Sequence, residues 1–241
     1  RFILLAVDLT GLDAESLFHD AGLARVLTPI GTASRHFRMD RRRLFLLGTG
    51  DFGAAAASRI AAAFPMAFAG CALVDGESTA TLNAGNLKLL PFDKKSDTLT
   101  ALTWFTELPM RTAYPLNFEV TLTEQKLGRH FWVQALRFDP PEAVPAGKVA
   151  RFKVSVDKAT NTITLESEFV YRYKLFLNDE IVNLDQEIKI VRNGEVYRYQ
   201  AVRSVGTLLD NFASTLDAGM VFPAWLQQVD VPIPEAAGEG R

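Results

Sequence analysis

The chain has 241 residues, of which 48% are hydrophobic and 22% are charged, so it is long enough for one large hydrophobic core or two smaller ones. Its formal net charge of -2 gives no electrostatic reason to expect a nucleic-acid partner, because binding to phosphates requires a basic face. The most apolar stretch, residues 60–74, is interrupted by Pro65 and Gly70 and is too short for a transmembrane helix. We therefore expect neither nucleic-acid binding nor a membrane-spanning segment.

Short apolar runs alternate with helical stretches over about the first 110 residues, a pattern typical of a parallel sheet covered by helices on both faces. The expected strands are residues 2–7, 44–47, 68–74 and 87–92. Cys71, the only cysteine, lies within the third of these strands among apolar neighbours. We therefore expect it to be buried and inert.

Three helices are expected between and after these strands. Asp13 can cap the first, and the second is an alanine-rich helix over residues 53–64 that stops at Pro65. The third covers residues 97–108, and its spacing places three apolar side chains on one side, those of Leu99, Leu102 and Phe105.

The pattern changes near Pro115, where apolar residues begin to alternate with a period of two, as in antiparallel β-strands. The dipeptide Asn193-Gly194 favours a type I′ hairpin turn, followed by a return strand over residues 196–200. One short helix is expected over residues 205–216. This half is therefore predicted to be an all-β, sandwich-like module.

These patterns divide the chain into three parts. Residues 1–112 are expected to form an α/β domain with a parallel sheet, and residues 113–233 the β-rich module. The glycine- and glutamate-containing residues 234–241 are expected to be a disordered tail.

Residues 40–48, Asp-Arg-Arg-Arg-Leu-Phe-Leu-Leu-Gly, resemble the approach to the nucleophile elbow in bacterial α/β-hydrolases of the esterase and depolymerase type. The resemblance continues through Pro65 and residues 68–70 and covers roughly thirty residues. Residues 128–133, 176–179 and 191–194 resemble parts of the β module that follows the hydrolase domain in some of these esterases. The resemblance implies a partial α/β-hydrolase-like sheet whose first strands precede Arg1, and by analogy an extracytoplasmic location.

The nucleophile elbow of this family has the pattern G-x-S-x-G on a strained turn between a strand and a helix, with backbone N–H groups directed at the oxyanion. Aligned without gaps, the pattern falls on Gly48, Thr49, Gly50, Asp51 and Phe52, with Gly53 directly after. Gly50 stands where the family has its serine. The resemblance therefore implies a degenerate, non-catalytic protein with a structural role or a role in binding an unidentified ligand or protein partner.

An active ester hydrolase is a first alternative. Asp51 could replace the serine, since aspartate is the nucleophile of some members of the superfamily, and Asp93 or Asp97 could be the acid of the triad. The histidines do not follow the family order of serine, acid and histidine, because two precede the turn and one falls in a strand of the β module. These are His19, His36 and His130. Their spacing also gives no metal site, so we expect no metal and no cofactor.

A dinucleotide-binding enzyme is a second alternative. Residues 48–53 also fit the pattern G-x-G-x-x-G after a strand and before a helix, and Asp75 is near the distance at which an acidic residue would bind a ribose.

The aromatic residues of the chain could form a carbohydrate-binding surface, but we expect them to pack in the core or at an interface, since large aromatic side chains mostly contribute buried area. The residues concerned are Trp104, Trp132, Tyr171, Tyr173 and Trp225.

Overall fold

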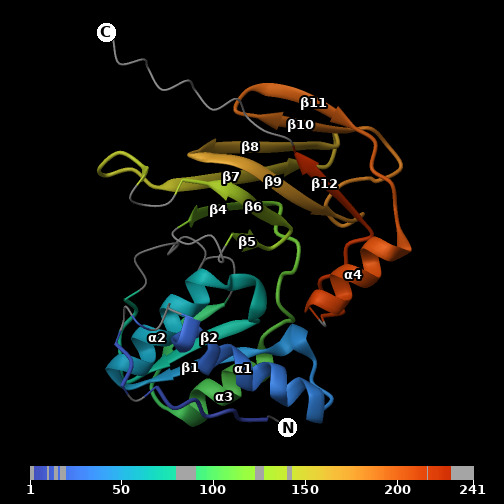
Figure 1. Ribbon diagram of the computed structural model, residues 1–241. Helices are drawn as coiled ribbons and strands as arrows, with labels where there is room; N and C mark the ends of the chain where they lie inside the picture. Colours follow the sequence, from blue (N-terminus) through green and yellow to red (C-terminus); the bar gives the residue numbers. More distant parts are fainter. Residues whose placement is uncertain are drawn as a thin grey trace.

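A computed structural model describes residues 3–9, 11–13, 16, 20–79, 91–122, 128–139, 143–215 and 217–228. A parallel sheet with three α-helices forms one end of the molecule, and two further sheets with a fourth α-helix form the other end of this described part (Figure 1). The expected mixture of a helix-covered parallel sheet and antiparallel β-structure is confirmed.

The parallel sheet has the strand order β1-β2-β3, in which β1 (Phe45–Thr49), β2 (Gly70–Val74) and β3 (Phe92–Lys95) follow one another in the chain. Its helices are α1 (Asp20–His36), α2 (Gly50–Ala63) and α3 (Thr98–Glu107). Two short 3₁₀ segments, η2 (Arg41–Arg43) and η3 (Pro65–Ala67), precede β1 and β2.

Both faces of β2 are buried, because helices cover the sheet on its two sides. Cys71 and Leu73 face a cluster that contains Val26 of α1 and the alanines of α2, whereas Ala72 and Val74 face α3. Burial raises the pKa of the Cys71 thiol to about 12, so this side chain stays a neutral thiol at physiological pH. The prediction of a buried cysteine is confirmed.

Local sequence explains where two of the helices begin. The Asp97 carboxylate accepts a hydrogen bond from the backbone N–H of Thr100 at 2.9 Å and so caps α3, the helix expected over residues 97–108. The alanine-rich α2 begins at Gly50, three residues earlier than expected. The expected cap Asp13 accepts a hydrogen bond from the backbone N–H of Ser16 at 2.7 Å, upstream of α1.

Two predictions for this half are wrong. The strand expected over residues 2–7 is absent, since residues 3–9 are neither helix nor strand; Val7 and Leu9 instead pack against the cluster between α1 and α2. Leu99 is 74% exposed, because α3 turns Ala101 and Phe105 toward the sheet. The strand expected over residues 87–92 begins only at Phe92, and residues before Pro91 lie outside the described part.

The other end of the molecule contains two sheets. The five-stranded sheet has the order β11-β10-β8-β7-β4, and the four-stranded sheet has the order β12-β9-β6-β5. Their strands are β4 (Asn117–Leu122), β5 (Arg129–His130), β6 (Val133–Phe138), β7 (Ala150–Asp157), β8 (Thr162–Glu168), β9 (Val170–Leu177), β10 (Ile188–Arg192), β11 (Glu195–Tyr199) and β12 (Ala224–Gln228).

Side chains from both sheets form one hydrophobic core. Phe152 of β7 and Tyr173 of β9 have ring centroids 5.6 Å apart, and both are fully buried. Trp132 is also fully buried and donates its indole N–H to the Pro115 carbonyl at 2.8 Å. The two sheets are therefore held together by aromatic packing, with the buried indole nitrogen satisfied.

The β-strands agree with the alternating pattern of the sequence. Asn193 and Gly194 both have positive φ, 47° and 89°, and form the expected hairpin turn between β10 and β11. One pairing departs from the expected antiparallel arrangement, because β10 lies parallel to β8. The expected short helix is α4 (Val205–Thr215), and the strand β12 that follows it was not expected.

A buried ion pair joins the two ends of the molecule. The Arg111 guanidinium, on the segment between α3 and β4, donates from Nη2 to Oδ2 of Asp217 at 2.5 Å. Nη1 of the same guanidinium donates to the Met66 carbonyl and lies 3.5 Å from the sulfur of Met220. Because Met66 belongs to η3 and Asp217 follows α4, Arg111 ties the α/β end to the segment that leads into β12.

Candidate functional site

The turn from β1 to α2 is the part of the chain that the sequence assigns to the elbow. Thr49 is extended, with φ of −120°, and Gly50 is the first residue of α2, with φ of +66°. A positive φ is strained for residues other than glycine, and it is found where a strand turns sharply into a helix. Gly50 therefore has the backbone conformation expected at a strained elbow, without a side chain.

Gly48 is the glycine that allows α2 to approach β1. A Cβ atom on Gly48 would lie 2.4 Å from the Gly53 carbonyl oxygen and 2.8 Å from the Cα of Ala54. A Cβ atom on Gly53 would have only ordinary contacts, at 3.7 Å or more. A Cβ atom on Gly50 would meet nothing within 4 Å, so there is open space at the position that the ungapped alignment gives to the serine.

The loop after β2 packs directly against this turn. Asp75, the residue after β2, has a positive φ of 53°, and the following residue is Gly76. A Cβ atom on Gly76 would lie 2.6 Å from the carbonyl oxygen of Gly50. The carboxyl ends of β1 and β2 thus form a tight edge at which Asp75 stands next to the glycine turn.

The carboxylates proposed for a triad have other partners. Asp93 forms an ion pair with Lys95 at 2.7 Å, and Asp97 caps α3 through Thr100. The Lys95 hydrogen bond lowers the pKa of Asp93, and the bonds from Thr100 lower that of Asp97. Asp51 is exposed on the first turn of α2.

Neither of the two histidines that the structure describes reaches the turn. His36 is exposed at the end of α1, before the chain enters β1, and it lines an apolar hollow of about 720 Å³ with residues such as Leu5 and Phe37. His130 lies in β5, in the β-rich end of the molecule. It is 2% exposed, and its ring centroid is 6.4 Å from that of Phe152. His19 lies outside the described residues. The glycine turn therefore has no histidine base among the residues that the structure places.

The described residues also contain no group of three metal-ligating side chains, and none of their helices is long and apolar enough to cross a membrane.

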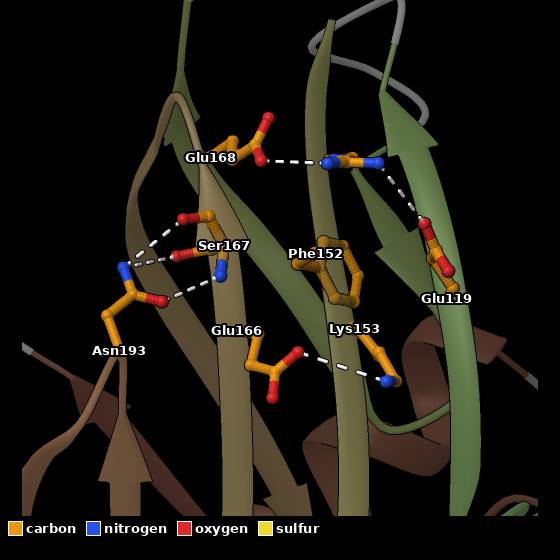
Figure 2. A pocket seen from close by; sticks show the side chains of 8 residues that line it. Glu119, Phe152, Lys153, Glu166, Ser167, Glu168 and Asn193 are labelled. Carbon is orange, nitrogen blue, oxygen red and sulfur yellow. Dashed lines mark hydrogen bonds and ion pairs between the residues drawn. The ribbon is translucent and has the colours of Figure 1, made fainter.

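A second hollow, of about 370 Å³, lies on the outer face of the five-stranded sheet, over β4, β7 and β8 (Figure 2). Opposite charges on neighbouring strands pair across it. Arg151 contacts Glu168 at 2.8 Å and Glu119 at 3.9 Å, and Lys153 lies 3.9 Å from Glu166. Three carboxylates and two cations line the hollow, so each cation has an acidic partner within 3.9 Å and one carboxylate is in excess.

The aromatic residues divide into two groups. Trp132 and Tyr173 are fully buried, which confirms core packing for them. Trp225 of β12 is 42% exposed, so it does not pack in the core. In the sequence, nothing distinguishes Trp225 from the aromatic residues of the core, so its exposure is visible only in the structure.

No protein-family model, curated protein or solved structure matches this chain.

Proposed function

We propose that this chain is a degenerate, non-catalytic α/β-hydrolase-like protein with a sandwich-like β module, and that it acts by binding and not by hydrolysing esters. The observation that supports the proposal is the conformation of Gly50. It combines a φ of +66° with open space on its Cβ side, at the position where the aligned pattern requires serine.

In this proposal the turn has the backbone conformation of an elbow without the reactive group. A serine in this conformation would be strained, and hydrolases accept this strain because it exposes the hydroxyl to the substrate. Glycine adopts the same conformation without strain and carries no hydroxyl to form an acyl intermediate. The close contact at Gly48, where family members also need a small residue, supports the alignment.

We expect the protein to remain unlabelled by a fluorophosphonate probe, because the turn offers no serine and the described residues place no histidine beside it. Intact-mass analysis with peptide mapping measures this, beside an active serine hydrolase as the positive control. The Gly50→Ser variant is also expected to stay unlabelled, since a new hydroxyl would lack its base. Stoichiometric labelling of the unmodified protein at any serine would contradict the proposal. Ester hydrolysis that is lost in Asp51→Asn would favour the active-hydrolase alternative instead.

The position of Asp75 favours a dinucleotide-binding function as the second candidate. It ends the strand next to β1 and stands beside the glycine turn, as a ribose-binding carboxylate does. The spacing at Gly53 argues against this function, because the third glycine of the fingerprint is required for close packing of helix on strand, whereas here a Cβ atom would be tolerated.

A thermal-shift titration with NAD decides between the two candidates. A dinucleotide at one hundred times its Kd would stabilise the native state by about 2.7 kcal/mol, which is a rise of several degrees in Tm. That rise would be smaller in Asp75→Ala if the carboxylate binds the ribose. If the chain is instead the non-catalytic binding protein proposed above, we expect NAD to leave the Tm of both the unmodified protein and Asp75→Ala unchanged.

A further inference from the structure

The four-stranded sheet has an outer face that differs from its inner one. Tyr173, Leu175 and Leu177 of β9 are fully buried in the core between the sheets. The side chains between them alternate to the opposite face, as in any β-strand, and include Lys174 and Phe176. The outer face of the sheet therefore carries the side chains that point to the same side as Lys174.

Four polar side chains form one continuous row across this face. In the register of the sheet, Arg129 of β5 stands opposite Gln134 of β6, Gln134 opposite Lys174 of β9, and Lys174 opposite Gln227 of β12. Neighbouring strands are about 4.8 Å apart, so the row extends about 14 Å across all four strands. It contains two cations and two amides in a line, with the Arg129 guanidinium at one end only partly exposed.

Aromatic rings lie in the next row of the same face. Trp225 of β12 stands opposite Phe176 of β9. The Lys174 ammonium lies 4.4 Å from the Trp225 ring centroid and 5.0 Å from that of Phe176, and the Arg129 guanidinium lies 4.3 Å from the Phe176 centroid. These contacts hold both cations in place, while Trp225 keeps 42% of its surface exposed.

Among the residues that the structure describes, the charges of the row have no acidic partner. Within this part of the chain neither Arg129 nor Lys174 forms an ion pair with a carboxylate, in contrast to Arg151 and to Lys153 (Figure 2) on the outer face of the other sheet. The carboxylate that acts on Arg129 from a distance is Asp217, whose charge is already matched by Arg111. The hollow on the five-stranded sheet therefore has more carboxylates than cations, whereas the row on the four-stranded sheet carries two cations beside an exposed aromatic ring.

We propose that this row binds an anionic polysaccharide built of uronic acids. Lys174 and Arg129 attract the carboxylates, the amides of Gln134 and Gln227 bond to sugar hydroxyls, and the exposed part of the Trp225 ring packs against the apolar face of a sugar ring. A linear polymer fits a straight row on a sheet better than a compact ligand does. The small number of cations and the overall charge of -2 disfavour a nucleic acid, whose affinity depends on many phosphate contacts.

Polygalacturonate is a suitable probe, because its methyl-esterified form has the same sugar backbone without the charge. Isothermal titration of the full chain is expected to show binding to polygalacturonate, weakening with added salt, and no measurable binding to the methyl ester. Lys174→Gln and Trp225→Ala are each expected to weaken the affinity about tenfold, as loss of a charged hydrogen bond or an aromatic contact does.

Two control variants match these changes elsewhere on the surface. Lys153→Gln removes a cation from the outer face of the other sheet, and Phe212→Ala removes a side chain that is 39% exposed on α4. Both are expected to leave the affinity unchanged within about twofold. Thermal melts of all four variants check that each is folded.

Several results would overturn the proposal. One is the absence of polygalacturonate binding, and another is an affinity for the methyl ester equal to that for polygalacturonate. A third is a loss of affinity in Lys153→Gln as large as that in Lys174→Gln. Tighter binding of single-stranded oligothymidylate than of polygalacturonate would also overturn it, since a stacking platform for nucleic acid would give that result. None of these outcomes depends on the turn at Gly50. The proposal of a polysaccharide site and the proposal of a non-catalytic turn can therefore each fail without the other.

Discussion

The Asp217→Ala variant is expected to lose about 3 to 5 kcal/mol of unfolding free energy, because it leaves a buried guanidinium without its counter-charge. The Arg111 side chain is 2% exposed and that of Asp217 10%. The folded variant would have to bury this positive charge uncompensated or open the contact between the two ends of the molecule. Urea denaturation followed by tryptophan fluorescence measures the loss.

An exposed ion pair supplies the matched control. Asp185 pairs with Arg203, and their side chains are 74% and 40% exposed. Asp185→Ala is expected to cost about 1 kcal/mol or less, since water screens this pair. If Asp217→Ala costs no more than Asp185→Ala, the Arg111 pair does not hold the two ends together in solution.

Gly48→Ala is the second change with a large expected effect. Its new methyl group would lie 2.4 Å from the Gly53 carbonyl oxygen and 2.8 Å from the Cα of Ala54. Both are backbone atoms and cannot rotate away, so α2 must move off β1. We expect a loss of about 3 kcal/mol in unfolding free energy.

The other two glycines of the turn are controls, because alanine is expected to change the unfolding free energy differently at each of them. Gly53→Ala meets only ordinary contacts inside α2, so it is expected to be neutral or to stabilise by up to about 1 kcal/mol through helix propensity. Gly50→Ala has free space but a φ of +66°, which is expected to cost about 1 to 2 kcal/mol. Chemical denaturation is expected to rank the three variants in stability as Gly53→Ala, then Gly50→Ala, then Gly48→Ala. A Gly48→Ala variant as stable as Gly53→Ala would show that β1 and α2 do not pack as described.

The elements that could be predicted from the sequence are those with a strong local signal. The alanines of α2, the apolar spacing of α3 and the Asn193-Gly194 turn act through their own backbone and close neighbours, and the structure contains both helices and the turn that they predict. The apolar residues 2–7 have the propensity of a strand, but a strand also requires a partner with free hydrogen-bonding groups, and this segment does not pair with β1. Propensity alone does not supply that partner.

The glycine turn could be located from the sequence, but the row of the four-stranded sheet could not. Arg129, Gln134, Lys174 and Gln227 come from four strands separated by loops of different length, and only the register of the sheet brings them into line. The strand β12 itself has no alternating pattern, and it forms because β9 offers an open edge nearly fifty residues earlier in the chain. Arg111 likewise looks in the sequence like a linker arginine, since its partner Asp217 is distant in the chain.

The late position of β12 has a consequence for how the protein is made. During synthesis, β9 leaves the ribosome with Leu175 and Leu177 in place but with one edge unpaired until residues 224–228 follow. An apolar strand with a free edge is a template for pairing with other chains. A nascent chain that stalls in α4 would expose this edge, and the cell would then have to shield it with a chaperone until translation resumes.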